Sequence, residues 1–299
     1  MKHRTPFWMR SLLFILTFLF MYRSFSILLT NPFESESYLL ENMINEQDSF
    51  DIAILSSSHG FCSFDPQIME QVLPESDIHN LSIANFSIGQ VSVVLQQMIE
   101  EGKTPNVVVL DMYSFNIGVR FWNQTSFYNT YSKTRQPKYI GKILSLYPLN
   151  QWPYVLSPLL YQHENWKSSK QLESNLKNFR NIDDETEKRI LADLGYGHEG
   201  FRPYKEVVPL NDYLHSLNNP KKISITEDNL IGFERILSIC EEYDIQLLAI
   251  LAPYPKAFYA QNEDLEKLSE QYGVTIYDFN ESPDEFNHFQ FLDWGHMNT

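Results

Sequence analysis

Short apolar runs alternate with amphipathic segments in two parts of the chain. Runs at 52–55, 78–83 and 106–110 lie in the first part, and runs at 245–251 and 274–277 lie in the second. Each run has the length and composition of a buried strand. Helix caps and apolar faces mark four segments, two that begin at 65 and 226 and two at 91–101 and 263–272. This alternation predicts an α/β fold, a three-layer sandwich with a central parallel sheet between helices.

The N-terminal segment has a different pattern. A basic tail precedes an apolar stretch from Phe7 to Leu29, which is long enough to span a membrane if Arg10 and Arg23 reach toward the two interfaces. The absence of a small-x-small cleavage site after it favours a signal anchor over a cleaved signal peptide. The basic tail places the N-terminus in the cytoplasm. We therefore expect a single-pass protein of the cell membrane, with 1–30 as cytoplasmic tail and anchor helix and an extracytoplasmic domain after it.

The rest of the chain divides by composition. Residues 31–49 are polar and acidic, and we interpret them as a juxtamembrane spacer. Residues 50–299 form the α/β domain. Within it, residues 114–225 are rich in Tyr, Asn, Pro and Trp and lack clear periodicity, which indicates an insertion of helices and loops. Substrate specificity is the role we consider for this insertion, because loops on a rigid scaffold often carry it.

Composition excludes several classes of function. The formal net charge of −15 argues against a nucleic-acid partner and against adhesion to an anionic lipid surface. Cys62 and Cys240 are too few for a disulfide scaffold. The chain also has neither a CxxC nor an HExxH pattern, so we expect no metal site. The chemistry we consider therefore uses side chains alone, with no cofactor.

Three serines and a histidine follow the first predicted strand directly. In parallel sheets the site lies at the carboxyl ends of the strands, and a tight turn there presents a nucleophile well. We take Ser58 as the candidate nucleophile, although spacing alone does not separate it from Ser56 and Ser57. The alternative is that these serines only satisfy backbone groups of a turn. His59 is expected to orient the loop or to touch the substrate.

A second motif lies near the C-terminus. Asp293 and His296 are three residues apart, so one turn brings them together and the carboxylate can hold the imidazole in one tautomer. With Ser58 they would complete a Ser-His-Asp hydrolase or acyltransferase. The alternative is a surface turn in which the two residues are paired by chance.

In this order, the motifs resemble those of the SGNH (GDSL-like) hydrolase superfamily. Ser-Ser-His in place of Gly-Asp-Ser is similar to the membrane-anchored branch that works beside membrane-bound O-acyltransferases. Proteins of alginate O-acetylation and teichoic acid D-alanylation belong to that group. The resemblance covers residues 50–113 and 226–298 and implies an SGNH/flavodoxin-like sheet with the catalytic residues named above.

The resemblance also implies an oxyanion site. The segment from Asn80 to Asn85 is similar to the family's Asn-x-x-x-x-Gly, whose last residue donates a backbone N–H. The N–H groups of Ser58 and Asn85 would then hold the oxyanion. The family's Gly-x-Asn-Asp motif should follow the strand that ends at 110, but the sequence there differs from the motif. The side-chain donor that this motif supplies to the oxyanion site is therefore Tyr113, Asn116 or absent.

The function that the resemblance implies is serine acyl transfer outside the cytoplasm, in O-acylation of a cell-surface polysaccharide. A membrane-bound O-acyltransferase is the expected partner. One alternative is a membrane-tethered carbohydrate or lipid esterase. Another is a catalytically degenerate scaffold for a membrane-bound O-acyltransferase, which the altered third motif favours. Because family members usually continue with a helix after the histidine, we expect either that this helix is missing or that the natural chain extends past Thr299.

Overall fold

The central element of the computed structural model is one parallel sheet. The structure describes residues 6–29, 44, 49–83, 86–116, 141, 144, 149, 152, 223, 225–253 and 263–280. Within them, five strands pair in the order β2-β1-β3-β4-β5, and every pair is parallel. The strands are β1 (Ile52–Leu55), β2 (Ile78–Asn80), β3 (Val107–Asp111), β4 (Gln246–Leu251) and β5 (Ile276–Asp278). The predicted α/β fold with a central parallel sheet is confirmed.

The strand order locates one special place on the sheet. From β1 the chain moves to β2 on one side and then returns past β1 to β3 on the other side. Order 2-1-3-4-5 is the flavodoxin-like doubly wound arrangement, in which ligands bind beyond the carboxyl ends of the strands that flank this reversal. Here those strands are β1 and β3, so a ligand site is expected at the loops after Leu55 and Asp111.

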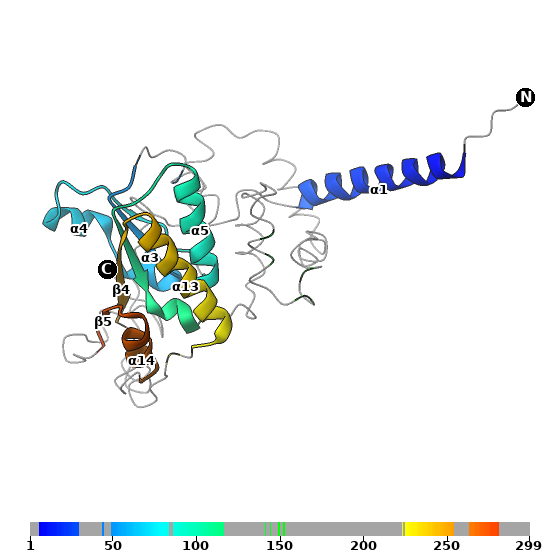
Figure 1. Ribbon diagram of the computed structural model, residues 1–299. Coiled ribbons are helices and arrows are strands. Elements are labelled where there is room, and N and C mark those ends of the chain that lie inside the picture. The colour runs from blue at the N-terminus through cyan, green and yellow to red at the C-terminus, as the bar shows by residue number, and fades with distance from the viewer. Residues whose placement is uncertain are drawn as a thin grey trace, which may run out of the picture.

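Alternation along the strands gives the sheet two apolar faces. On one face, Ala53, Leu55 and Leu110 share a large core with the helices α5 (Ile88–Glu100), α13 (Glu227–Glu242) and α14 (Glu263–Tyr272). On the other face, Ile54 and Val109 pack with side chains that include Met69 of helix α4 (Pro66–Val72). Figure 1 shows α4 on one side of the sheet and α5 and α13 on the other. The sheet is therefore covered on both faces.

The helices begin where polar caps allow them to begin. Ser87 and Gln90 form a capping box, and α5 consequently starts at Ile88, three residues before the predicted start at 91. Asp65 accepts from the Gln67 N–H at the start of α4, with Pro66 in the first turn, as the sequence predicts. The Thr226 side chain caps α13 in the same way.

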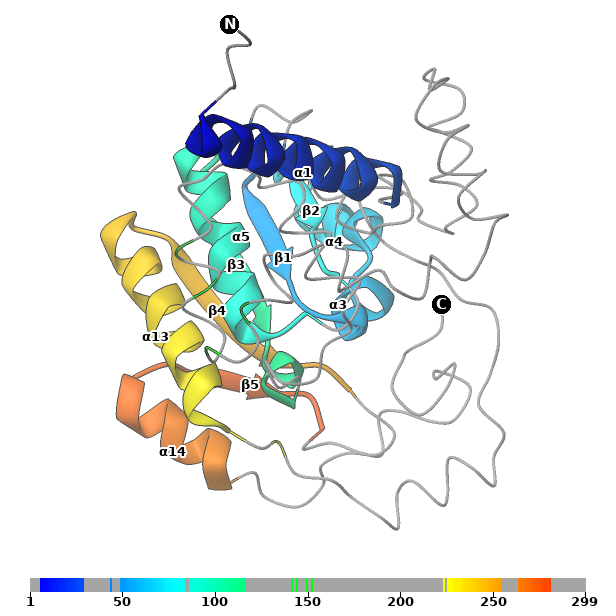
Figure 2. The same cartoon turned by 90° about the vertical axis from the view of Figure 1, so that its right-hand side faces the viewer.

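Helices α5 and α13 lie side by side and approach closely (Figure 2). A Cβ added to Gly232 of α13 would lie 2.7 Å from both the Cα and the backbone nitrogen of Gly89 in α5. Two glycines at the crossing thus let the backbones of the helices touch. Helix α14 joins the same layer, where Tyr272 packs edge-on against Phe233 with ring centroids 5.6 Å apart.

The main core extends beyond the predicted α/β segments. Ile44, within the segment that the sequence assigns to a spacer, is 1% exposed and belongs to this core. The Lys103 ammonium, just after α5, donates to the Ile44 carbonyl oxygen. Part of the polar segment before β1 is therefore fastened to the domain.

A long helix precedes the domain. Helix α1 (Phe7–Leu29) has 23 residues, and its apolar side chains are largely exposed, such as Phe7 and Phe14. Figure 1 shows it projecting away from the sheet. Among the residues that the structure describes, no helix combines the length and apolarity needed to cross a membrane.

Candidate active site

The three serines after β1 have three different environments. Ser56 is buried, and its hydroxyl donates to Asp111 Oδ2 over 3.2 Å. Ser57 is also buried and caps the short helix α3 (Ser58–Ser63), its hydroxyl oxygen accepting from the His59 N–H. Ser58 is the first residue of α3 and is half-buried. Of the three, Ser58 has the most access to solvent, and it stands at the start of a helix rather than on the predicted tight turn.

Asp111, the last residue of β3, lies at the centre of the site. Its side chain is fully buried. Oδ2 faces the loop after β1, where Ser56 Oγ lies at 3.2 Å and His59 Nδ1 at 3.5 Å. Oδ1 accepts from the backbone N–H groups of Tyr113 at 3.1 Å and Ala252 at 3.4 Å. These donors compensate the carboxylate for its lost hydration, which a buried charge requires.

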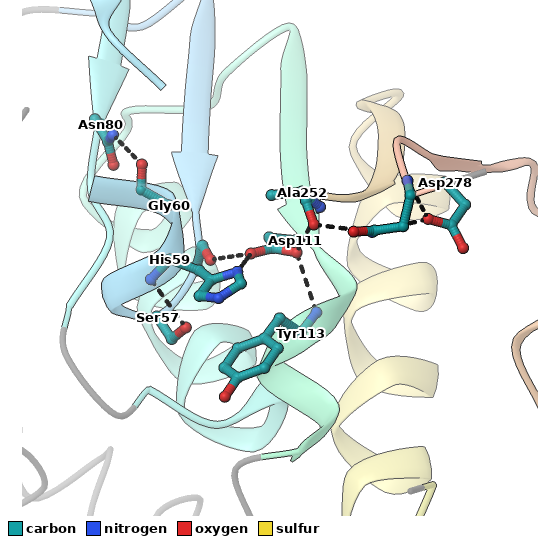
Figure 3. A network of polar contacts seen from close by, with 10 residues as sticks. Ser57, His59, Gly60, Asn80, Asp111, Tyr113, Ala252 and Asp278 are labelled. Carbon is teal, nitrogen blue, oxygen red and sulfur yellow. Dashed lines mark hydrogen bonds and ion pairs between the residues drawn. The ribbon is translucent and has the colours of Figure 1, made fainter. Parts of the chain in front are cut away.

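His59 is held between Asp111 and an aromatic ring. The imidazole is 1% exposed and stacks on the Tyr113 ring, with centroids 3.9 Å apart and planes 7° from parallel. Figure 3 shows the ring between Asp111 and Tyr113. That His59 orients the loop or touches the substrate stays a prediction. The stacking gives the Tyr113 ring, which is also predicted as a donor of the oxyanion site, a packing contact with His59.

Asn80 and Gly60 hold α3 in place. The Asn80 amide nitrogen donates to the carbonyl oxygens of Gly60 at 2.9 Å and Phe64 at 2.8 Å. Gly60 itself passes close to its neighbours, because an added Cβ would lie under 3.0 Å from Ser56 Cβ and Ser82 Oγ. The loop that carries Ser58 is thus fixed from the ends of both β2 and β3.

The polar network continues across the carboxyl edge of the sheet. The Asn280 amide, just after β5, donates to the Ala252 carbonyl oxygen at 3.1 Å. Ala252, just after β4, in turn donates its N–H to Asp111. Figure 3 shows these contacts running from the loop after β1 to Asp278 at the end of β5. One continuous set of contacts therefore links the ends of four parallel strands.

Several residues predicted for the site lie outside this description. Asp293, His296 and Asn85 are outside the described residues, so their distances to Ser58 stay predictions. Asn116 ends the 3-10 helix η1 (Met112–Asn116), and its side chain is likewise outside the description. Of the predicted residues, the structure brings together the rings of His59 and Tyr113, and His59 directly follows Ser58 in the chain.

Sequence reasoning missed Asp111 as a functional candidate. The available signal was an acidic residue at the end of an apolar strand beside the predicted nucleophile loop. An aspartate is almost never fully buried unless it is paired, so a carboxylate at the end of a buried strand indicates partners in the neighbouring loops. In the part of the chain that the structure describes, no group of three or more His, Cys, Asp or Glu side chains could hold a metal ion.

No family model matches this chain, and no curated protein matches it.

Proposed function

We propose that this protein is a serine acyltransferase or esterase of the SGNH type, with Ser58 as nucleophile. The observation that carries the proposal is the position of Ser58. It is half-buried, is the third residue after β1 and stands at the reversal of strand order, while Ser56 and Ser57 are buried in supporting contacts. Ligand sites of doubly wound sheets lie at this place.

The proposed mechanism is acyl transfer through a covalent intermediate. Ser58 Oγ attacks an ester carbonyl while His296 takes the hydroxyl proton, and Asp293 stabilises the resulting imidazolium. The N–H groups of Ser58 and Asn85 hold the oxyanion, and one such donor contributes about 3–4 kcal/mol to lowering the barrier. His296 then returns the proton to the departing alcohol. A sugar hydroxyl or water accepts the acyl group from Ser58 in the second half of the reaction.

A fluorophosphonate probe tests the nucleophile. We expect the intact protein to be labelled and Ser58→Ala to lose the label. Ser63→Ala is the matched control, because Ser63 is a half-buried serine at the other end of the same short helix. Labelling of Ser58→Ala at the rate of the intact protein would refute the assignment. No labelling of the intact protein would favour the non-catalytic scaffold for a membrane-bound O-acyltransferase.

The acyl acceptor separates the two enzymatic possibilities. We propose a cell-surface polysaccharide as acceptor and a membrane-bound O-acyltransferase as partner. The experiment supplies an acyl ester with and without an O-deacylated polysaccharide and follows both acyl groups on the polymer and free acid. Acyl transfer to the polymer supports the transferase, whereas release of free acid alone, at a rate that the polymer does not change, supports the esterase.

We also propose that α1 attaches the chain to the cell membrane, with the domain outside the cytoplasm. The support is the exposure of its apolar side chains, since a surface of this kind is unfavourable in water. An alkaline carbonate wash of membranes is expected to leave the full chain in the pellet. Its release into the supernatant would contradict attachment, and protection of the domain from protease added to intact cells would contradict the topology.

A further inference from the structure

Asp111 contacts both sides of the proposed nucleophile. Ser56 lies two residues before Ser58 and His59 directly follows it, and the side chains of both approach the same oxygen, Oδ2 of Asp111. The other oxygen, Oδ1, accepts from backbone N–H groups just after β3 and β4. One carboxylate thus joins the nucleophile loop to the rigid sheet.

We propose that Asp111 is a positioning residue of this site, which holds Ser58 in its reactive place and keeps a proton on His59 Nδ1. The inference rests on the proposed function of Ser58. Asp111 acts through Ser56 and His59 and is assigned no contact with the substrate. Its effect is geometric, and a displacement of about 1 Å at a reacting group can slow a reaction by about 100-fold.

The negative charge of Asp111 also favours one tautomer of His59. The backbone N–H groups at Oδ1 and the Ser56 hydroxyl at Oδ2 are donors, so every oxygen of the carboxylate acts as an acceptor. A protonated Nδ1 facing Oδ2 is attracted, whereas a lone pair there would be repelled by the negative charge. Stacking on Tyr113 holds the ring in this orientation.

The substitution Asp111→Asn tests this reasoning with little change in shape. The two backbone N–H groups need an acceptor, so the amide oxygen takes the place of Oδ1 and the amide nitrogen takes that of Oδ2. An N–H donor then faces His59 Nδ1, which should give up its proton and accept. We expect the long-range ¹H–¹⁵N spectrum of His59 to change from a protonated to an unprotonated Nδ1.

The same variant should react more slowly at Ser58. We expect fluorophosphonate labelling to slow by about 10-fold to 100-fold. Ser56→Ala removes only one contact of Oδ2 and should slow labelling less while leaving Nδ1 protonated. It serves as the second variant in case Asp111→Asn does not fold, which thermal unfolding will reveal.

A second buried histidine provides the matched control. His79 is the middle residue of β2, and its Nε2 lies 2.7 Å from Oδ1 of Asp77, which precedes the strand at the end opposite the carboxyl edge that carries Ser58. Asp77→Asn should therefore alter the spectrum of His79 and leave the labelling rate of Ser58 unchanged. An equal loss of labelling in Asp77→Asn and Asp111→Asn would show that only general stability is involved, and would overturn the proposal.

The two measurements separate the proposals. If folded Asp111→Asn labels at the full rate with an unchanged His59 spectrum, Asp111 is not a positioning residue. If the intact protein is not labelled, the proposed function fails. In that case the His59 spectrum still tests whether Asp111 keeps a proton on His59 Nδ1. A spectrum that is the same in Asp111→Asn and in the intact protein overturns that claim as well.

Discussion

The close approach of α3 to its neighbours makes Gly60 a sensitive position. In Gly60→Ala, the new methyl group would lie under 3.0 Å from Ser56 Cβ and Ser82 Oγ. Overpacking of this kind costs about 1–3 kcal/mol. Alanine recovers up to about 1 kcal/mol through its better helix propensity. With the full helix-propensity gain subtracted, the expected net loss in the free energy of unfolding is about 0–2 kcal/mol.

The more informative effect of Gly60→Ala is on Ser58. Relief of the overlap requires α3 to move away from Ser56, and Ser58 is the first residue of α3. We expect the rate of fluorophosphonate labelling per folded molecule to fall by about 10-fold or more. Urea unfolding supplies the folded fraction, so the effect on the site is measured separately from the effect on stability.

Gly232→Ala is the matched comparison, because it adds the same methyl group at another crowded position of a helix, where the nearest atoms lie 2.7 Å away instead of 2.4 Å. Its Cβ would lie 2.7 Å from the Gly89 backbone, so the unfolding free energy should fall by about 0–2 kcal/mol once the same helix-propensity gain is subtracted. The labelling rate of the folded molecules should stay unchanged. If Gly60→Ala labels normally, or if both variants lose labelling equally, the link between α3 placement and Ser58 reactivity is refuted.

Three further predictions concern stability. Asn80→Ala removes the three hydrogen bonds of a buried amide, two donated and one accepted from the Ser82 N–H, and should cost about 2–3 kcal/mol in urea unfolding, whereas Asn106→Ala, which removes an exposed amide bonded to Asp51, should cost under about 1 kcal/mol. Ser87→Ala breaks the capping box of α5 and should cost about 1 kcal/mol by the same measurement; a change near zero would contradict the cap. Burial raises the pKa of the Cys240 thiol from 9.0 to about 11. The neutral thiol therefore contributes stability that is complete below about pH 9 and lost as the pH rises through about 11, amounting to at most about 2 kcal/mol. The unfolding free energy of the intact chain should fall more steeply over this range than that of Cys240→Ala, and parallel curves would contradict this.

The sheet was predictable because its strands carry strong local signals. Short apolar runs bounded by polar residues identified β1, β3 and β4 to within about a residue at each end. The run at 78–83 is a strand only to Asn80, although backbone bonds from Leu81 to Ile54 and from Ile83 to Ser56 continue alongside β1. Local pattern finds such a run but does not determine where regular pairing ends.

The site was less predictable because its contacts join residues distant in sequence. The partners Ser56 and Asp111 are 55 positions apart, and only the strand order places them on adjacent strands. Helix α3 was not predicted, since a six-residue helix that contains Gly60 is too short for an apolar period to emerge. The choice among the three serines likewise depended on burial, which spacing does not reveal.

The central claim is that Ser58 becomes acylated, and mass spectrometry of the trapped intermediate tests it most directly. The full chain is mixed with an activated aryl acetate, quenched in acid within seconds and digested. The account predicts an acetyl group on the peptide that contains Ser58, present in Ser63→Ala and absent in Ser58→Ala. An acetyl group that persists at the same level in Ser58→Ala, or no acetylated peptide from the intact chain, would contradict it.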